Sequence, residues 1–106
     1  MIAHGDVRWF RFRRPDKKRP VVVLTRNSAI AYLGELTVAP ITTTIRSIDS
    51  EVVLTQHDGM PRDCAVNLDH LMTVKKSEIG SLISRLNNAK LDELRAALLF
   101  AFELSP

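Results

Sequence analysis

Several features that define common protein classes are scarce or missing in this chain of 106 residues. It has one cysteine, Cys64, so no disulfide can form within the chain, and no Cys/His cluster has the spacing of a zinc site. It has no apolar run long enough to span a bilayer, and its first ten residues lack the apolar stretch of a signal peptide. These absences argue against a disulfide or zinc scaffold and predict a soluble, cytoplasmic protein with no membrane partner.

Motifs of several enzyme classes are absent as well. There is no nucleophile elbow, P-loop or dinucleotide fingerprint, and the carboxylates do not have the spacing of a two-metal nuclease site. The three histidines, His4, His57 and His70, fall in separate predicted turns or near the terminus, so nothing in the pattern pairs them for acid–base chemistry. The sequence therefore predicts no metal site and no cofactor.

What the chain does contain is enough apolar sequence for one small domain. Apolar residues make up 45% of it, and the formal net charge of +3 is compatible with a polyanionic partner. We expect a single domain over residues 1–106. Because a chain of this size buries a modest fraction of its surface, dimerisation would add stability.

Short apolar segments with turn residues between them predict a mostly β chain. Aromatic and β-branched content predicts strands at residues 6–12, 20–25, 36–44, 51–55 and 64–67, with shorter ones possible at 71–75 and 80–83. Charges around a proline predict a loop at residues 13–18, and residues 27–33 suggest a loop with one helical turn. Turn residues, including Asp58-Gly59, mark residues 56–63.

The end of the chain has the pattern of an amphipathic helix over residues 88–104. Its apolar positions recur at helical spacing: Leu91, Leu94, Leu98, Ala101 and Phe102. Either Asn87 or Asn88 can cap its first turn. Strands followed by one such helix predict an α+β domain, a small curled sheet or barrel with the helix packed on it.

Two charged or polar strand ends are the main candidates for chemistry. Arg19 precedes the predicted strand at 20–25, and Thr42 stands near the end of the next strand. If these strands are neighbours, a guanidinium and a hydroxyl converge on one site that suits a phosphodiester. The alternative is that Arg19 is a solvated surface residue and that the threonines simply end a strand.

Basic and aromatic residues alternate near the start of the chain. The basic residues are Arg8, Arg11, Arg13, Arg14, Lys17, Lys18 and Arg19, and Trp9, Phe10 and Phe12 stand among them. Such a segment suits single-stranded nucleic acid, whose phosphates need positive charge and whose bases stack. The alternative is a core strand followed by a solvated loop, and we expect Trp9 itself to lie in the core.

Five ordered blocks of the sequence resemble the MazF/PemK toxins of bacterial toxin–antitoxin pairs. They are Gly5-Asp6-Val7 with Trp9, residues 19–24 (Arg-Pro-Val-Val-Val-Leu), residues 38–42 (Val-Ala-Pro-Ile-Thr), residues 63–69, and residues 79–82 with the final helix. The resemblance covers nearly the whole chain. It implies a CcdB/PemK-type SH3-like barrel, a bent antiparallel sheet with a C-terminal helix, in a homodimer.

The resemblance also implies an activity and partners. The activity is metal-independent, sequence-specific cleavage of single-stranded RNA, in which the 2′-OH attacks the phosphate and leaves 2′,3′-cyclic phosphate and 5′-OH ends. The partner is an antitoxin whose acidic C-terminal tail occupies the RNA groove. Two alternatives on related folds are a CcdB-like toxin that binds a topoisomerase and an SH3-like nucleic-acid-binding module without chemistry.

The family's two main catalytic positions correspond to Arg19 and Thr42. An arginine side chain rarely gives up its proton, which favours charge stabilisation by Arg19 over proton donation, and Thr42 would donate a hydrogen bond to a phosphate oxygen. Asp16 is a weak candidate for the base that some relatives supply as a glutamate. RNA binding is predicted for the surrounding residues Arg13, Arg14, Lys17, Lys18, Thr43, Thr44 and Arg46.

Overall fold

The computed structural model describes residues 1–13 and 17–104, and it has seven strands and two α-helices within them. The strands are β1 (Asp6–Phe12), β2 (Lys17–Val23), β3 (Glu35–Thr42), β4 (Glu51–Leu54), β5 (Cys64–Asn67), β6 (Met72–Lys75) and β7 (Ile79–Arg85). The helices are α1 (Asn27–Ile30) and α2 (Asn88–Ala101), with 3₁₀ turns at Gln56–Asp58 and Lys76–Glu78. The predicted order of strands followed by a helix is confirmed.

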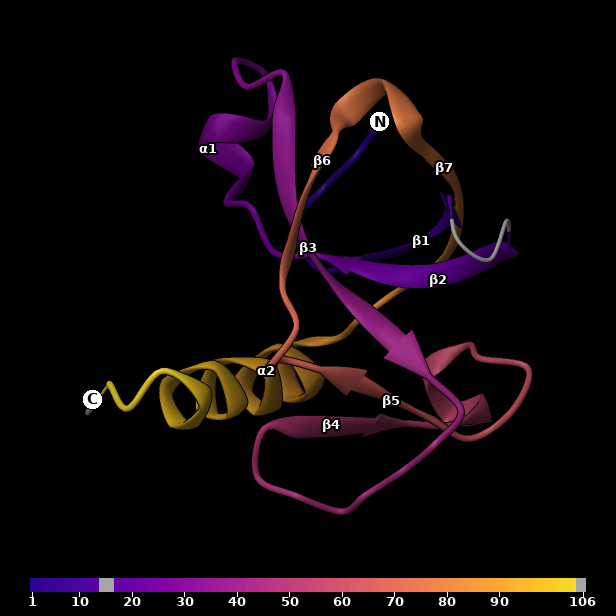
Figure 1. Cartoon of the computed structure of the whole chain (residues 1–106), viewed down its shortest axis with the longest axis vertical. Coiled ribbons are helices and arrows are strands. Elements are labelled where there is room, and N and C mark those ends of the chain that lie inside the picture. Colours follow the sequence, from indigo (N-terminus) through magenta and orange to yellow (C-terminus); the bar gives the residue numbers. More distant parts are fainter. Residues whose placement is uncertain (14–16, 105–106) are drawn as a thin grey trace.

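The strands form one strongly curled antiparallel sheet in the order β4-β5-β3-β2-β1-β7, and β6 pairs with β3 outside that path. The long strand β3 connects the two halves. Its first part pairs with β2 and β6, and its end pairs with β5. Figure 1 shows β3 starting beside β6, passing the end of β2 and ending near β5, in the part of the molecule where β4 and β5 lie beside α2. The predicted SH3-like bent sheet with a C-terminal helix is confirmed.

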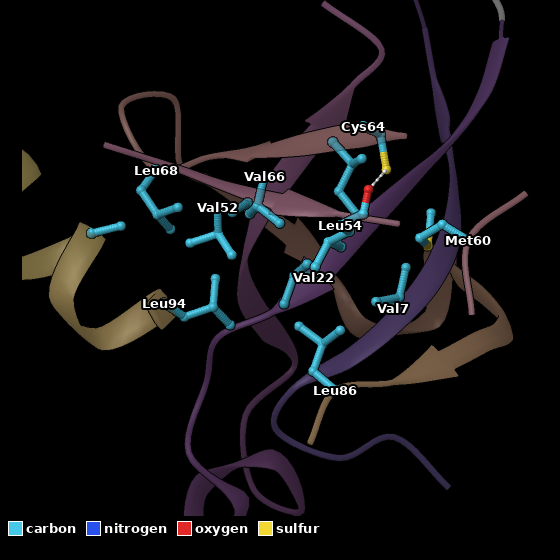
Figure 2. Packing of buried hydrophobic residues seen from close by; sticks show 13 residues of the cluster. Val7, Val22, Val52, Leu54, Met60, Cys64, Val66, Leu68, Leu86 and Leu94 are labelled. Carbon is cyan, nitrogen blue, oxygen red and sulfur yellow. Dashed lines mark hydrogen bonds between the residues drawn. The ribbon is translucent and has the colours of Figure 1, made fainter. Parts of the chain in front are cut away.

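Strand alternation divides the core into two clusters. Val22 faces the larger cluster, which also holds Leu54 and Leu68, whereas Val21 and Val23 face the smaller one. Leu94 packs α2 onto the larger cluster and lies beside Val52 (Figure 2). The helix therefore covers one end of this cluster, and the other end approaches the surface near Met60 and Cys64.

The helix α2 begins where predicted but ends three residues early. Asn87 is the cap, because its Oδ1 accepts the backbone N–H of Lys90 at 2.9 Å. The helix ends at Ala101, since Glu103 has a φ of 54° and the backbone turns out of the helical path there. Phe102, predicted on the buried face, is 53% exposed. No helix of the described residues is long and apolar enough to cross a membrane.

Two strand boundaries near the candidate site also differ from the prediction. Lys17 and Lys18 belong to β2 rather than to a loop, because they pair with Phe12 and Arg11 of β1. Their charge does not oppose strand structure, since their side chains are exposed. The strand β3 ends at Thr42, two residues earlier than predicted.

Candidate active site

A cavity of about 250 Å³ lies at the surface end of the larger core cluster. Its lining residues are Trp9, Arg19, Pro20, Ile41, Thr42, Thr43, Met60, Pro61, Arg62, Cys64 and Ile83. Arg19 and Thr42, the two residues predicted to meet, thus lie in one cavity. The floor is mostly apolar, and the lining also carries the guanidinium groups of Arg19 and Arg62 and the hydroxyl groups of two threonines.

The cavity forms where β3 leaves β2. The two strands pair as far as Val21 and Pro40, and beyond this point β3 pairs with β5 instead, through Ile41 and Thr42. Continuing the β2–β3 register by two residues would place Arg19 opposite Thr42. Pro20, which has no N–H to donate, occupies the position where the ladder ends. The separation of the strands therefore gives both side chains access to one space.

The hydroxyl of Thr42 is held by the chain that follows it. The backbone N–H of Thr44 donates a hydrogen bond of 3.1 Å to Thr42 Oγ1. A hydroxyl that accepts in this way still has its own hydrogen to donate. Thr42 is half-buried, and its β-branched side chain has few rotamers. The cavity therefore offers an oriented hydroxyl donor as well as the Arg19 guanidinium.

Trp9 belongs to this cavity and not to the core, which corrects the prediction. Phe10 and Phe12 point to the other face of β1, where they pack on the smaller cluster with ring centroids 5.2 Å apart. Alternation along the strand turns Trp9 the opposite way, and it stays half-buried. The ammonium of Lys18 lies 5.8 Å from the centroid of its ring.

Arg8 is not part of the basic surface, although the sequence groups it with its neighbours. Its Nε donates to Asp6 Oδ2 at 2.9 Å, and its two other nitrogens donate to the carbonyls of Gly80 and Met1 at 3.1 and 3.0 Å. Arg8 and Asp6 are both buried. The guanidinium, held by Asp6, therefore ties β1 to β7 and to the N-terminal segment through these two carbonyls.

The structure distributes the predicted RNA-binding residues unevenly. Thr43 lines the cavity, whereas Thr44 contributes its backbone N–H to Thr42. Arg46 lies apart from the cavity lining and pairs with buried Glu51 at 3.6 Å. Arg13, Lys17 and Lys18 are exposed beside residues 14–16, and the predictions for Arg14 and Asp16 fall outside the described residues.

No imidazole or carboxylate is among the described residues that line the cavity. Cys64 is there, with its Sγ 3.8 Å from the carbonyl oxygen of Leu54 (Figure 2). Burial raises the pKa of its thiol, and Asp63 and Asp58 raise it further. Cys64 is therefore a protonated wall residue of the cavity. Among residues 1–13 and 17–104, no three His, Cys, Asp or Glu side chains are grouped to hold a metal.

Arg62 is a charged residue of the cavity that the sequence pattern does not predict. It follows a rigid turn in which Thr55 and Asp58 cap each other and Gly59 has a φ of 88°. Ser84 donates a hydrogen bond to the Asp58 carbonyl, and Met60 is buried in the larger cluster. The sequence did contain one signal for Arg62, a basic residue that closely follows a capped turn. Only the fold, however, brings this turn to the cavity beside β2.

The fold and the cavity define a class of small proteins. These proteins have a curled sheet and a cationic pocket at the point where one strand changes its pairing partner. The family model described as the PemK-like, MazF-like toxin of type II toxin–antitoxin systems matches residues 3–102. A probable endoribonuclease MazF5 of Mycobacterium tuberculosis is 40% identical over 104 residues, which are 97% of this chain and 94% of that protein.

Solved structures of MazF proteins have the same fold as this chain. The M. tuberculosis toxin MazF-mt6 superposes with a TM-score of 0.87 at 32% identity, covering 95% of this chain and 99% of that one. A mycobacterial endoribonuclease solved in complex with its cognate antitoxin has a TM-score of 0.88 at 22% identity, covering 100% and 99%, and shows the shared fold. The chain belongs to the PemK/MazF toxin family. The predicted class of RNA-cleaving toxin is therefore confirmed at the level of the family.

Proposed function

We propose that this chain is a toxin that cuts single-stranded RNA, with the scissile phosphodiester held between Arg19 and Thr42. The observation that carries the proposal is the lining of one cavity by both side chains, where β3 separates from β2. The ribose 2′ oxygen attacks the adjacent phosphorus, and the bond to the next nucleotide's 5′ oxygen breaks. The 2′ proton passes to solvent and the leaving oxygen takes up a proton, which gives 2′,3′-cyclic phosphate and 5′-OH ends.

The two residues act through charge and hydrogen bonding. Arg19 stabilises the negative charge that grows on the phosphoryl oxygens and the leaving oxygen, because a guanidinium is a planar cation whose donors match a phosphate. Thr42 donates its hydroxyl hydrogen to a phosphoryl oxygen, since its own oxygen already accepts from Thr44. We assign no metal or other cofactor to this reaction.

The exposed cations at the ends of β1 and β2 suit two partners that are both negatively charged. Arg13, Lys17 and Lys18 lie along the β1–β2 ends, where they would neutralise RNA phosphates. The same charges would attract an antitoxin with an acidic C-terminal tail, and such a tail would block the RNA. Arg14 is proposed for the same role from the sequence alone.

We also propose that the whole chain, residues 1–106, acts as one domain in a cytoplasmic homodimer. An open apolar groove lies between the end of α2 and the β3–β4 connection. Three of its residues are large, apolar and exposed to water: Ile48 at 44%, Phe100 at 57% and Leu104 at 60%. Apolar surface of this kind is typical of a protein–protein interface.

The direct test is incubation of the purified chain with end-labelled single-stranded RNA in EDTA. Wild type should leave cyclic-phosphate ends, Arg19→Ala should abolish cleavage, and Thr42→Ala should slow it at least about tenfold, or roughly 1.4 kcal/mol of barrier. Thr42→Ser, which keeps the hydroxyl, is the matched control and should keep most of the rate.

Other outcomes point to the alternatives. RNA that stays intact but shifts in a gel indicates a binding module, and RNA that stays intact and unbound indicates a CcdB-like toxin with a protein target. Undiminished turnover by Arg19→Ala would remove the proposed site.

A further inference from the structure

The indole of Trp9 is the one aromatic side chain among the described residues that line the cavity. It belongs to neither core cluster and remains half-buried. A tryptophan that faces a cavity beside two guanidinium groups is not explained by packing. The position instead suits a ligand that presents both a flat ring and a negative charge.

The surrounding strands fix the base of this side chain. Trp9 pairs with Pro20 of β2, and β7 passes so close that a Cβ on Gly80 would lie 2.9 Å from the Trp9 carbonyl oxygen and 3.4 Å from Trp9 Cβ. The glycine is therefore what lets β7 approach. Since strands hold its backbone on two sides, the point from which the ring extends is fixed before any ligand arrives, which lowers the cost of binding.

The rest of the cavity matches one nucleobase. Its floor is apolar, from Pro20, Ile41, Met60 and Ile83, and its volume of about 250 Å³ is below the range of roughly 300–1,000 Å³ typical of drug-sized ligands. The polar groups, from Arg19, Thr42, Thr43 and Arg62, are all hydrogen-bond donors. The Lys18 ammonium near the indole adds positive charge for a phosphate.

We propose that Trp9 is the stacking platform for one unstacked base of the RNA, next to the phosphate held by Arg19 and Thr42. This rests on the proposed function and deepens it. A base stacked here fixes its ribose and therefore the position of the phosphate that follows. In a duplex each base is paired and stacked on its neighbours, so Trp9 also gives a physical reason for selecting single strands.

The chain carries its own reporter, because Trp9 is its single tryptophan. The probe is a random-sequence single-stranded RNA with 2′-O-methyl riboses, which lack the attacking hydroxyl and are not cut. Its matched control is an abasic oligomer of the same length and charge. The base-containing probe should quench Trp9 fluorescence and the abasic oligomer should not, with binding of both followed by anisotropy. Equal fluorescence changes with both, or none while the probe is bound, would overturn the proposal.

Substitutions give an independent readout. Trp9→Leu should weaken probe binding by about five- to 150-fold, the range for loss of one base–aromatic stack, and Trp9→Tyr should restore much of it. Binding by Trp9→Leu as tight as wild type contradicts the proposal, and the quench in wild type is informative even if this variant fails to fold.

The catalytic variant separates this inference from the proposed function. Arg19→Ala should keep the quench while losing cleavage. If Arg19→Ala still cuts RNA but the quench is present, the catalytic assignment fails and the stacking role stands. If Arg19→Ala is inactive but the quench is absent from bound wild type, the stacking role alone fails.

Discussion

At the scale of single residues, side-chain chemistry identified the candidate pair, whereas the direction of each side chain came from the fold. Arg19 and Thr42 were predicted as phosphate-binding types, and both line the cavity. Trp9 was predicted as core because large aromatics usually are, but its position on β1 turns it away from Phe10 and Phe12. Arg8, an apparent RNA-binding cation, is instead buried against Asp6.

Cys64 gives a prediction at this scale. Burial and nearby carboxylates raise its pKa, so the native thiol should react with iodoacetamide at pH 8 at least about tenfold more slowly than the denatured chain. Mass spectrometry over time measures both rates. Equal native and denatured rates would show that the thiol is accessible and that its pKa is not raised.

The raised pKa of Cys64 also makes the free energy of unfolding depend on pH. A thiol whose folded pKa is raised contributes stability below its unfolded value, near 9.0, and loses it as the pH rises through the folded pKa. Wild type should therefore lose more stability than Cys64→Ala between pH 8 and pH 10, measured as urea midpoints. A parallel loss in both proteins would contradict the assignment.

At the scale of elements, periodicity and caps located the strands and the helix, and long-range pairing set their ends. The strand β2 begins at Lys17 because β1 supplies a partner there, which no local pattern of charges reveals. The helix α2 begins after Asn87, and its last turn is lost where the backbone at Glu103 becomes left-handed.

The cap of α2 can be tested with neighbouring asparagines. Asn87→Ala removes the acceptor of the Lys90 N–H and should cost about 1 kcal/mol, or a fall in Tm of roughly 4–8 °C. Asn88→Ala, inside the first turn, is the matched control and should change Tm little. Thermal unfolding followed by circular dichroism measures both. A larger effect at Asn88 would assign the cap to that residue.

At the scale of the whole molecule, the site exists because β3 takes part in two halves of one curled sheet. The cavity opens where β3 changes partner from β2 to β5, and the turn before β5 brings Arg62 to its mouth. On another side of the chain, α2 and the β3–β4 connection leave apolar side chains in water. The proposed substrate site and the proposed dimer surface thus lie in different parts of one fold.

The proposed dimer surface is tested by two phenylalanines of similar exposure. Phe100 lines the apolar groove and Phe102 does not, although both are exposed at the end of α2. Phe100→Glu should shift the chain from dimer to monomer in sedimentation equilibrium, because a buried unpaired charge is costly, whereas Phe102→Glu should remain a dimer. Dimers of equal stability in both would place the interface elsewhere.

The sequence by itself determined the order of strands, the capped helix, the family and the two residue types suited to a phosphodiester, because these depend on local pattern and chemistry. Only the tertiary structure decided which side chains share a cavity: it added Trp9 and Arg62, and it removed Arg8. The physical reason is that contacts between segments distant in the chain set two things: the face of the sheet on which a residue lies, and the strand with which its own strand pairs. Those contacts depend on the pairing of the whole sheet, which no short stretch of sequence encodes.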